Sequence, residues 1–224
     1  MKTNTEYKSE ALAALKGNWP QAVLATFIVG AVCILVWTPY YWQYAKLLEN
    51  ATDIEALSGS TVWWLIGFAA MMLVGGPLIV GMVNAFKNLL VRGENRLVDA
   101  EFKIAFGNWL HHFWGYFLKY IFVLLWSLLF LIPGIIKSLA YAMTNYILVD
   151  YPELSANKAI DLSQEMMKGH KYDLFYLYLS FIGWYFLSIL TLGIGYLWLM
   201  PYIQAAQSSF YLDVKAEWEA RRAS

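Results

Sequence analysis

Apolar runs about as long as a bilayer is thick alternate along this chain with charged stretches. About 20 predominantly apolar residues are needed to cross the hydrocarbon of a bilayer, which is roughly 30 Å thick. Four runs have this character, and a fifth follows the glycine-containing sequence at 191–195, which predicts a tight turn between antiparallel helices. The five runs are Gln21–Tyr40, Val62–Val83, Phe113–Ile132, Phe175–Leu192 and Tyr196–Leu212.

A further run, Gly134–Val149, is short and contains polar residues, so it fits either a sixth span or a segment lying on the membrane surface. The positions of lysine and arginine distinguish these alternatives. With six spans and an internal N-terminus, only Lys46 and Lys137 lie outside, whereas with five spans the bias disappears. The positive-inside rule therefore favours six spans with both termini in the cytoplasm.

A short amphipathic stretch precedes each odd-numbered span and ends at a glycine, namely Gly17, Gly107 or Gly169. Glycine at these places suits a left-handed C-cap, after which the chain can turn into the bilayer. Thr3 and Glu6 form a candidate capping box for the first stretch. The residues predicted to share a face are Tyr7, Ala11, Ala14 and Leu15 in the first stretch, Val98, Phe102, Ala105, Phe106 and Trp109 in the second, and Ala156, Ile160, Ser163 and Met167 in the third.

These patterns predict an all-α fold, a polytopic transmembrane helix bundle with six spans in three hairpins, each preceded by a cytoplasmic amphipathic interfacial helix. Residues 1–224 form a single integral membrane domain, with repeat units at approximately 4–92, 95–150 and 153–215.

The even-numbered spans are predicted to form the centre of the bundle. Each has a proline near or inside it, and pairs of small residues four positions apart follow, which allow helix backbones to approach closely. Polar side chains also concentrate on these spans. The residues of this possible polar path are Asn84, Lys137, Ser138, Thr144, Asn145, Gln204 and Gln207.

Lys119 lies about six residues into the third span, and two interpretations of it stay open. Its stem is long enough to snorkel to the cytoplasmic interface, because six residues of helix rise only about 9 Å. Alternatively, its charge lines a path through the membrane, although no acidic residue lies inside any predicted span to pair with it.

The composition excludes an ordinary water-soluble protein, because 60% of the residues are apolar and 14% are charged. The 16 basic and 16 acidic residues balance, so no nucleic-acid partner is predicted. Cys33 is the single cysteine, which rules out an intramolecular disulfide. We expect no cofactor and no metal.

Common catalytic signatures are missing from the sequence, including phosphate loops, the HExxH motif and the nucleophile elbow, and we therefore expect a protein that is not an enzyme. His170 is the exception to consider. Asp150, Glu153, Asp161, Glu165 and Asp173 lie near it in sequence, and a carboxylate and histidine site at the cytoplasmic face is conceivable.

A set of motifs in the second half of the chain resembles a bacterial membrane-protein family, the one catalogued as domain of unknown function 975. The set comprises Leu131-Ile132-Pro133-Gly134, Asp150-Tyr151-Pro152, Gly169-His170-Lys171 and Pro201-Tyr202, with Ala14 to Trp19 as an earlier match. The resemblance implies a multi-pass protein of the bacterial cytoplasmic (inner) membrane. The family-motif residues, which carry no known role, are Pro133, Gly134, Asp150, Pro152, Gly169, His170, Lys171, Pro201 and Tyr202.

Three classes of function are compatible with these patterns. The first is a non-enzymatic accessory or structural protein that acts on lipid packing or on membrane partners, with the lipid bilayer, other membrane proteins or further copies of the chain as partners. The second is a channel or transporter whose polar path runs among the even-numbered helices. The third is a lipid-active enzyme that uses His170 and its neighbouring carboxylates.

Overall fold

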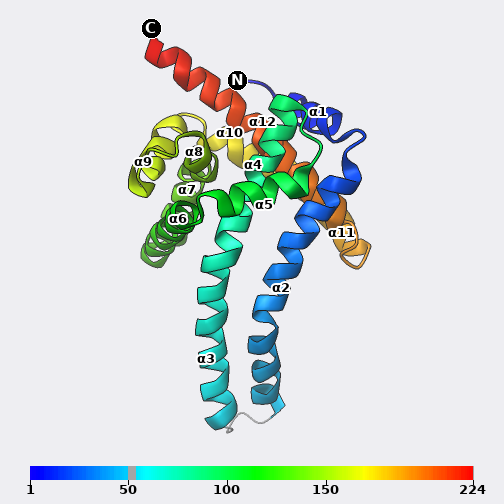
Figure 1. Cartoon of the computed structure of the whole chain (residues 1–224), viewed down its shortest axis with the longest axis vertical. Helices are drawn as coiled ribbons and strands as arrows, with labels where there is room; N and C mark the ends of the chain where they lie inside the picture. Colours follow the sequence, from blue (N-terminus) through cyan, green and yellow to red (C-terminus); the bar gives the residue numbers. More distant parts are fainter. Residues whose placement is uncertain (50–53, 224) are drawn as a thin grey trace.

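The computed structural model describes residues 1–49 and 54–223, and in this part of the chain helices account for nearly all residues and no strand is present (Figure 1). The first loop predicted outside, 46–61, therefore lies partly outside the described residues. The helices are α1 (Asn4–Leu15), α2 (Trp19–Glu49), α3 (Ile54–Ala70), the π-helix η1 (Met71–Gly75), α4 (Gly76–Arg92), α5 (Leu97–Gly107), α6 (Trp109–Leu129), α7 (Leu131–Ala140), α8 (Thr144–Asp150), α9 (Ala156–Met166), α10 (Lys171–Leu179), α11 (Ile182–Leu190) and α12 (Tyr196–Ala223).

Five segments among the described residues are long and apolar enough to cross a membrane, which is the all-α, multi-pass character that the sequence predicts. Helix α12 is not among them, and its apolar half carries Gln204, Gln207, Ser208 and Ser209. The five segments are Trp19–Glu49, Leu57–Arg92, Trp109–Leu129, Leu131–Asp150 and Lys171–Leu190.

Helix α1 begins as its sequence predicts and packs on α12. The side chain of Thr3 accepts a hydrogen bond from the backbone of Glu6, and Glu6 in turn accepts from the backbone of Thr3, which completes the capping box. The predicted apolar face is confirmed, with Tyr7, Ala11 and Leu15 buried. The Tyr7 hydroxyl donates to a carboxylate oxygen of Asp213 at 2.6 Å.

Two of the three predicted glycine caps are confirmed. Gly17 has φ +85° and Gly169 has φ +95°, in the left-handed region where a side chain would be strained. The prediction for Gly107 is wrong, because α5 continues through this residue and the chain turns at Asn108 instead, with φ −134° and ψ 55°. Asn108 thus separates the surface helix α5 from α6.

The first hairpin consists of α2 and of the continuous helix formed by α3, η1 and α4 (Figure 1). Helix α2 has 31 residues and is therefore about 46 Å long. Lys46, Glu49 and Glu55 place charge near the tip of this hairpin. Figure 1 shows that α2 and α3 extend far beyond the ends of the other two hairpins.

Pro77 helps to attach the second hairpin to the first. Proline has no N–H group, so it cannot donate to the carbonyl of Leu73 four residues earlier. That carbonyl instead accepts a hydrogen bond from the indole nitrogen of Trp109, at 2.7 Å. The start of α6 is therefore fixed beside the π-helix.

The second and third hairpins have short turns with apolar tips. Phe130 is extended, with φ −159° and ψ 148°, and joins α6 directly to α7. Gly134 of the family motif lies where α7 crosses Ser127 so closely that a Cβ atom would collide with it. In the third hairpin, Leu192 and Gly193 have positive φ in the turn between α11 and α12.

Two predicted spans are each divided into two helices. The run Gly134–Val149 is split between α7 and α8 by a turn at residues 141–143. The run Phe175–Leu192 is split between α10 and α11 at Ser180 and Phe181. Each break lies beside a polar contact to another helix. Met143 N donates to Ser163 Oγ at 3.2 Å, and the Ser180 carbonyl accepts from Lys8 at 2.8 Å.

Helices α4, α8 and α12 carry much of the buried core, as predicted for the even-numbered segments. Gly81 of α4 lies against the backbone oxygen of Glu101 in α5, where a Cβ atom would clash. Tyr146 of α8 stacks on Tyr211 of α12 with ring centroids 4.4 Å apart. Small residues at the crossings therefore allow close packing of these helices.

A cluster of charges joins the same three helices. Asp150 at the end of α8 forms a salt bridge with Lys87 of α4, and its other oxygen lies 2.7 Å from Lys215 Nζ of α12. The hydroxyl of Tyr211 donates to the carboxylate at 2.7 Å. The side chains of Asp150 and Lys87 are only 13% and 8% exposed, so this family-motif aspartate joins α4, α8 and α12 within the core.

Candidate functional site: a polar pocket between α4, α6, α7, α8, α10 and α12

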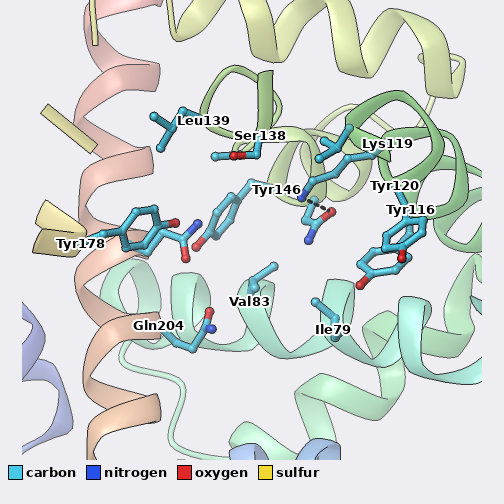
Figure 2. Close-up of a pocket in the computed structure, with 14 residues that line it drawn as sticks. Ile79, Val83, Tyr116, Lys119, Tyr120, Ser138, Leu139, Tyr146, Tyr178 and Gln204 are labelled. Atoms are coloured by element: carbon cyan, nitrogen blue, oxygen red, sulfur yellow. Dashed lines mark hydrogen bonds between the residues drawn. The ribbon is translucent and has the colours of Figure 1, made fainter. Parts of the chain in front are cut away.

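A pocket of about 370 Å³ lies among six helices, and polar and aromatic side chains converge on it (Figure 2). Its volume is at the lower end of the range for small-molecule sites. The lining residues come from segments far apart in the sequence. They are Ile79, Val83, Tyr116, Lys119, Tyr120, Val123, Ser138, Leu139, Ala142, Asn145, Tyr146, Tyr178, Gln204 and Gln207.

The structure brings together four of the seven residues of the predicted polar path, because Ser138, Asn145, Gln204 and Gln207 all line this pocket. Asn84 and Thr144 are fully buried beside it and are not lining residues. The polar residues of the even-numbered segments therefore converge, although they do not form one continuous lining.

Lys137 does not lie with the other members of the predicted path. Its ammonium group donates to Gln164 Oε1 of α9 at 3.0 Å and lies 4.8 Å from the centre of the Trp126 ring. The sequence-based topology places Lys137 outside and α9 inside the cell. In the structure these two side chains touch, so Lys137 of α7 lies directly beside α9.

Lys119 is the one charged residue that lines the pocket. Its ammonium group donates to Asn145 Oδ1 at 3.3 Å, the contact drawn as a dashed line in Figure 2. The side chain thus points into the protein and not toward its surface.

Buried polar atoms without a partner gather around the pocket. Asn84 Nδ2 donates to the backbone oxygens of Val80 and Asn145, at 2.9 and 2.8 Å, and so fixes α8 against α4. In the described part of the chain, Asn84 Oδ1, Thr144 Oγ1 and Gln204 Oε1 accept or donate no hydrogen bond. Because unpaired buried polar atoms are costly, they indicate a place for water or a ligand.

Glu101 is a buried acid that the sequence pattern does not single out. It lies on α5 and is fully buried. Within the described residues neither of its carboxylate oxygens has a hydrogen-bond partner. Burial raises the pKa of Glu101 to about 8, so the carboxyl group is mostly protonated at neutral pH. The signal in the sequence is weak, because Glu101 looks like one more charge on an amphipathic helix.

The predicted carboxylate and histidine site is only partly assembled. His170 Nε2 lies 3.1 Å from Glu217 Oε1, and Nδ1 lies 3.5 Å from Asp173 Oδ2. Asp150, by contrast, is occupied by the two lysines of the core cluster. Within residues 1–49 and 54–223 no group of three or more His, Cys, Asp or Glu residues is placed to hold a metal ion.

The other family-motif residues have structural places. Pro133 lies in the first turn of α7, where proline is tolerated, and Pro152 lies in the turn after α8. Lys171 begins α10. Pro201 is inside α12, and the Tyr202 ring packs edge-on against Phe181, with centroids 5.1 Å apart.

Comparison with known proteins gives one match. A family model described as "Protein of unknown function (DUF975)" matches residues 128–218. No curated protein and no solved structure matches the chain. The match begins after the motif at Ala14 to Trp19, so the likeness of the first half stays a prediction. From the tip of α6 to the second half of α12, the chain is similar to this family of unknown function, as its motifs predict.

Proposed function

We propose that this protein is a non-enzymatic membrane protein that acts on lipid packing, by inserting two shallow apolar hairpins into the cytoplasmic leaflet. The observation that carries the proposal is the contact between Lys137 and Gln164, which ties the second hairpin to the polar helix α9. In this account only α2 and α3 cross the bilayer, instead of the six spans that the sequence favours.

Helix α9 accompanies α6 along much of its length. Ser155, Ala156 and Asn157 share a hollow with the N-terminal turn of α6, and Gln164 meets Lys137 beyond the middle of α7. Helix α9 exposes Lys158, Asp161 and Glu165. Because charged side chains in hydrocarbon are costly, α9 belongs at the interface, and α6 lies there beside it.

Only the tip of the second hairpin extends beyond Lys137. About seven residues separate Lys137 from Phe130, a rise of about 10 Å against roughly 30 Å of hydrocarbon. The five tip residues, 128–132, are all apolar and between 62% and 74% exposed. Such a tip suits the interior of one leaflet and has no polar group to offer to an aqueous surface.

The third hairpin has the same relation to α1. The ammonium group of Lys8 donates to the Ser180 carbonyl and lies 4.3 Å from the centre of the Phe181 ring. Beyond Ser180 and Phe181, α11 continues for about nine residues, which is a length of about 14 Å. Its tip is also apolar, with Leu190 79% and Leu192 94% exposed.

The sidedness of the charges agrees with this account. With α2 and α3 as the crossing helices, Lys46 is the one basic residue left on the far side. On the near side, α5 presents Phe102 and Phe106 outward, 39% and 46% exposed. Two hairpins and this surface helix enlarge one leaflet only. This favours a curved membrane in which the protein-rich leaflet is on the convex side.

Reconstitution in vesicles of phosphatidylethanolamine and phosphatidylglycerol tests this function. We expect mean vesicle diameter, measured by electron cryomicroscopy, to fall as the protein-to-lipid ratio rises. Leu131→Asp combined with Leu192→Asp weakens this effect, because each aspartate deep in hydrocarbon costs about 3 kcal/mol. We expect Leu131→Asp to leave α7 folded, because Leu131 is the first residue of this helix and a negative charge at a helix N-terminus is stabilising.

The matched control is Leu48→Asp, at the charged tip of the first hairpin, where Leu48 is 71% exposed. We expect this variant to reshape vesicles as the wild type does. Wild-type protein that leaves vesicle diameter unchanged at every ratio contradicts the proposed function, as does a double variant that acts like the wild type.

The pocket favours one second candidate, a path for a solute or lipid among the even-numbered segments. Its support is the convergence of Asn145, Gln204 and Gln207 on one cavity. We expect the double variant Asn145→Ala and Gln204→Ala to abolish any solute or lipid flux that the wild type supports in vesicles. Unchanged fluxes in that variant would rule the path out.

A further inference from the structure

The polar pocket holds a positive charge that the protein does not balance. Lys119 is the one charged lining residue, and in the described part of the chain no carboxylate lies within ion-pair distance of it. An ammonium group can donate three hydrogen bonds, and the protein accepts one, at Asn145. A cation in a poorly solvated place is costly unless it is paired, so the pocket is suited to an anion.

The rest of the lining adds hydrogen-bonding groups of both kinds. Tyr178 contributes a hydroxyl group, and Gln204 Oε1 is a buried acceptor to which no described residue donates, whereas the Tyr146 hydroxyl is already hydrogen-bonded to Ser208 Oγ at 3.2 Å. Asn145 is held in place through its backbone oxygen by Asn84. A ligand with an anionic group and a hydroxyl group satisfies both Lys119 and Gln204.

An apolar hollow adjoins the pocket and indicates the rest of the ligand. It has a volume of about 320 Å³, shares Leu139 with the polar pocket, and is lined otherwise by Ile135, Ile136, Lys171, Tyr172 and Phe175. Its walls are α7 and α10, whose apolar side chains are exposed on the outside of the protein. An acyl chain suits this hollow, because its walls are almost wholly hydrocarbon.

We propose that the pocket binds a hydroxylated phosphate ester, the head group of an anionic phospholipid, with Lys119 pairing with the phosphate. The acyl chains then lie along the hollow between α7 and α10. This site goes beyond the action on lipid packing and requires binding only, without passage of the ligand across the membrane.

Native mass spectrometry of the full-length, delipidated protein in detergent tests the proposal. The probes are phosphatidylglycerol, which is anionic and hydroxylated, and phosphatidylcholine, which is zwitterionic. We expect the wild type to bind phosphatidylglycerol at least tenfold more tightly. Lys119→Met weakens that binding by about 10- to 100-fold, as expected for the loss of a charged hydrogen bond.

Two further variants separate a binding defect from a folding defect. Lys119→Arg keeps the charge and retains most of the affinity for phosphatidylglycerol. Lys137→Met removes a lysine of the same hairpin that does not line the pocket, and it binds as the wild type does. If Lys119→Met binds phosphatidylglycerol as tightly as Lys137→Met, or if the wild type does not distinguish the two lipids, the proposal is overturned.

Competition with soluble sn-glycerol 3-phosphate identifies the source of the phosphate ester. Displacement of the lipid shows that the head group alone is recognised, whereas lack of displacement shows that the acyl chains contribute. Both results support the site, provided that binding depends on Lys119. The readout is independent of vesicle shape, so failure here and failure of the proposed function are separate outcomes.

Discussion

Asp150→Asn lowers the free energy of unfolding by about 3 to 5 kcal/mol, because it leaves two largely buried lysines without their counter-ion. Lys87 and Lys215 both bind this carboxylate, and their side chains are 8% and 24% exposed. The substitution also weakens the hydrogen bond from Tyr211. Equilibrium unfolding in mixed detergent micelles, followed by tryptophan fluorescence, measures the effect.

Asp99→Asn is the matched control. Asp99 pairs with Arg96 at 3.8 Å on the surface of α5, and the two side chains are 67% and 81% exposed. Surface ion pairs contribute about 0 to 1 kcal/mol, so we expect little change. Equal losses in the two variants contradict the assignment of Asp150 as the charge that joins α4, α8 and α12.

Glu101 makes the free energy of unfolding fall as the pH rises. The folded-state pKa of Glu101 is raised to about 8 from the ordinary value of 4.5, so between these values the folded protein holds a proton that the unfolded chain has released. The stabilising contribution of the protonated form is complete below pH 4.5 and is lost as the pH approaches 8. The total loss is on the order of 5 kcal/mol.

Glu101→Gln removes this dependence, because the amide cannot ionise. We expect the thermal midpoint of the wild type in detergent to fall between pH 5 and pH 9 by clearly more than that of the variant. Glu153→Gln, at an exposed position after α8, keeps the wild-type profile. Parallel profiles for the wild type and Glu101→Gln show that this carboxyl group does not titrate across the range.

Local signals in the sequence predicted local structure well. The capping box at Thr3, the buried face of α1 and the left-handed caps at Gly17 and Gly169 depend on a few neighbouring residues, and all are confirmed. The convergence of Asn145 with Gln204 was also predictable, because polar residues avoid lipid and gather inside a bundle.

The buried face of α5 was not predictable by the rules for soluble helices. The sequence pattern predicts that Val98, Phe102, Ala105, Phe106 and Trp109 share a face, but of these the structure buries only Ala105, together with Leu97, Ala100 and Glu101. In a membrane, close helix packing uses small residues, and large apolar side chains can face lipid at no cost. Because the buried face differs from the predicted one, the sequence pattern did not single out Glu101.

The breaks in two apolar runs depend on contacts between distant segments. Nothing near Ser180 in sequence indicates that Lys8, on α1, reaches its carbonyl. In the same way, hydropathy alone does not show that α9 lies alongside α6 and meets Lys137. Counting apolar residues therefore identified membrane-seeking segments without determining how deep each one goes.

The most direct test of the account is the membrane depth of the two hairpin tips. In a Cys33→Ser background, spin labels at Phe130→Cys, Leu192→Cys and Leu48→Cys are compared in sealed, oriented vesicles, with oxygen and a membrane-impermeant nickel chelate as relaxing agents. The account predicts that labels at 130 and 192 collide with oxygen and not with chelate on the far side, while the label at 48 does meet that chelate. Labels at 130 and 192 that the far-side chelate relaxes as strongly as the label at 48 would contradict the account, because the hairpins would then cross the bilayer.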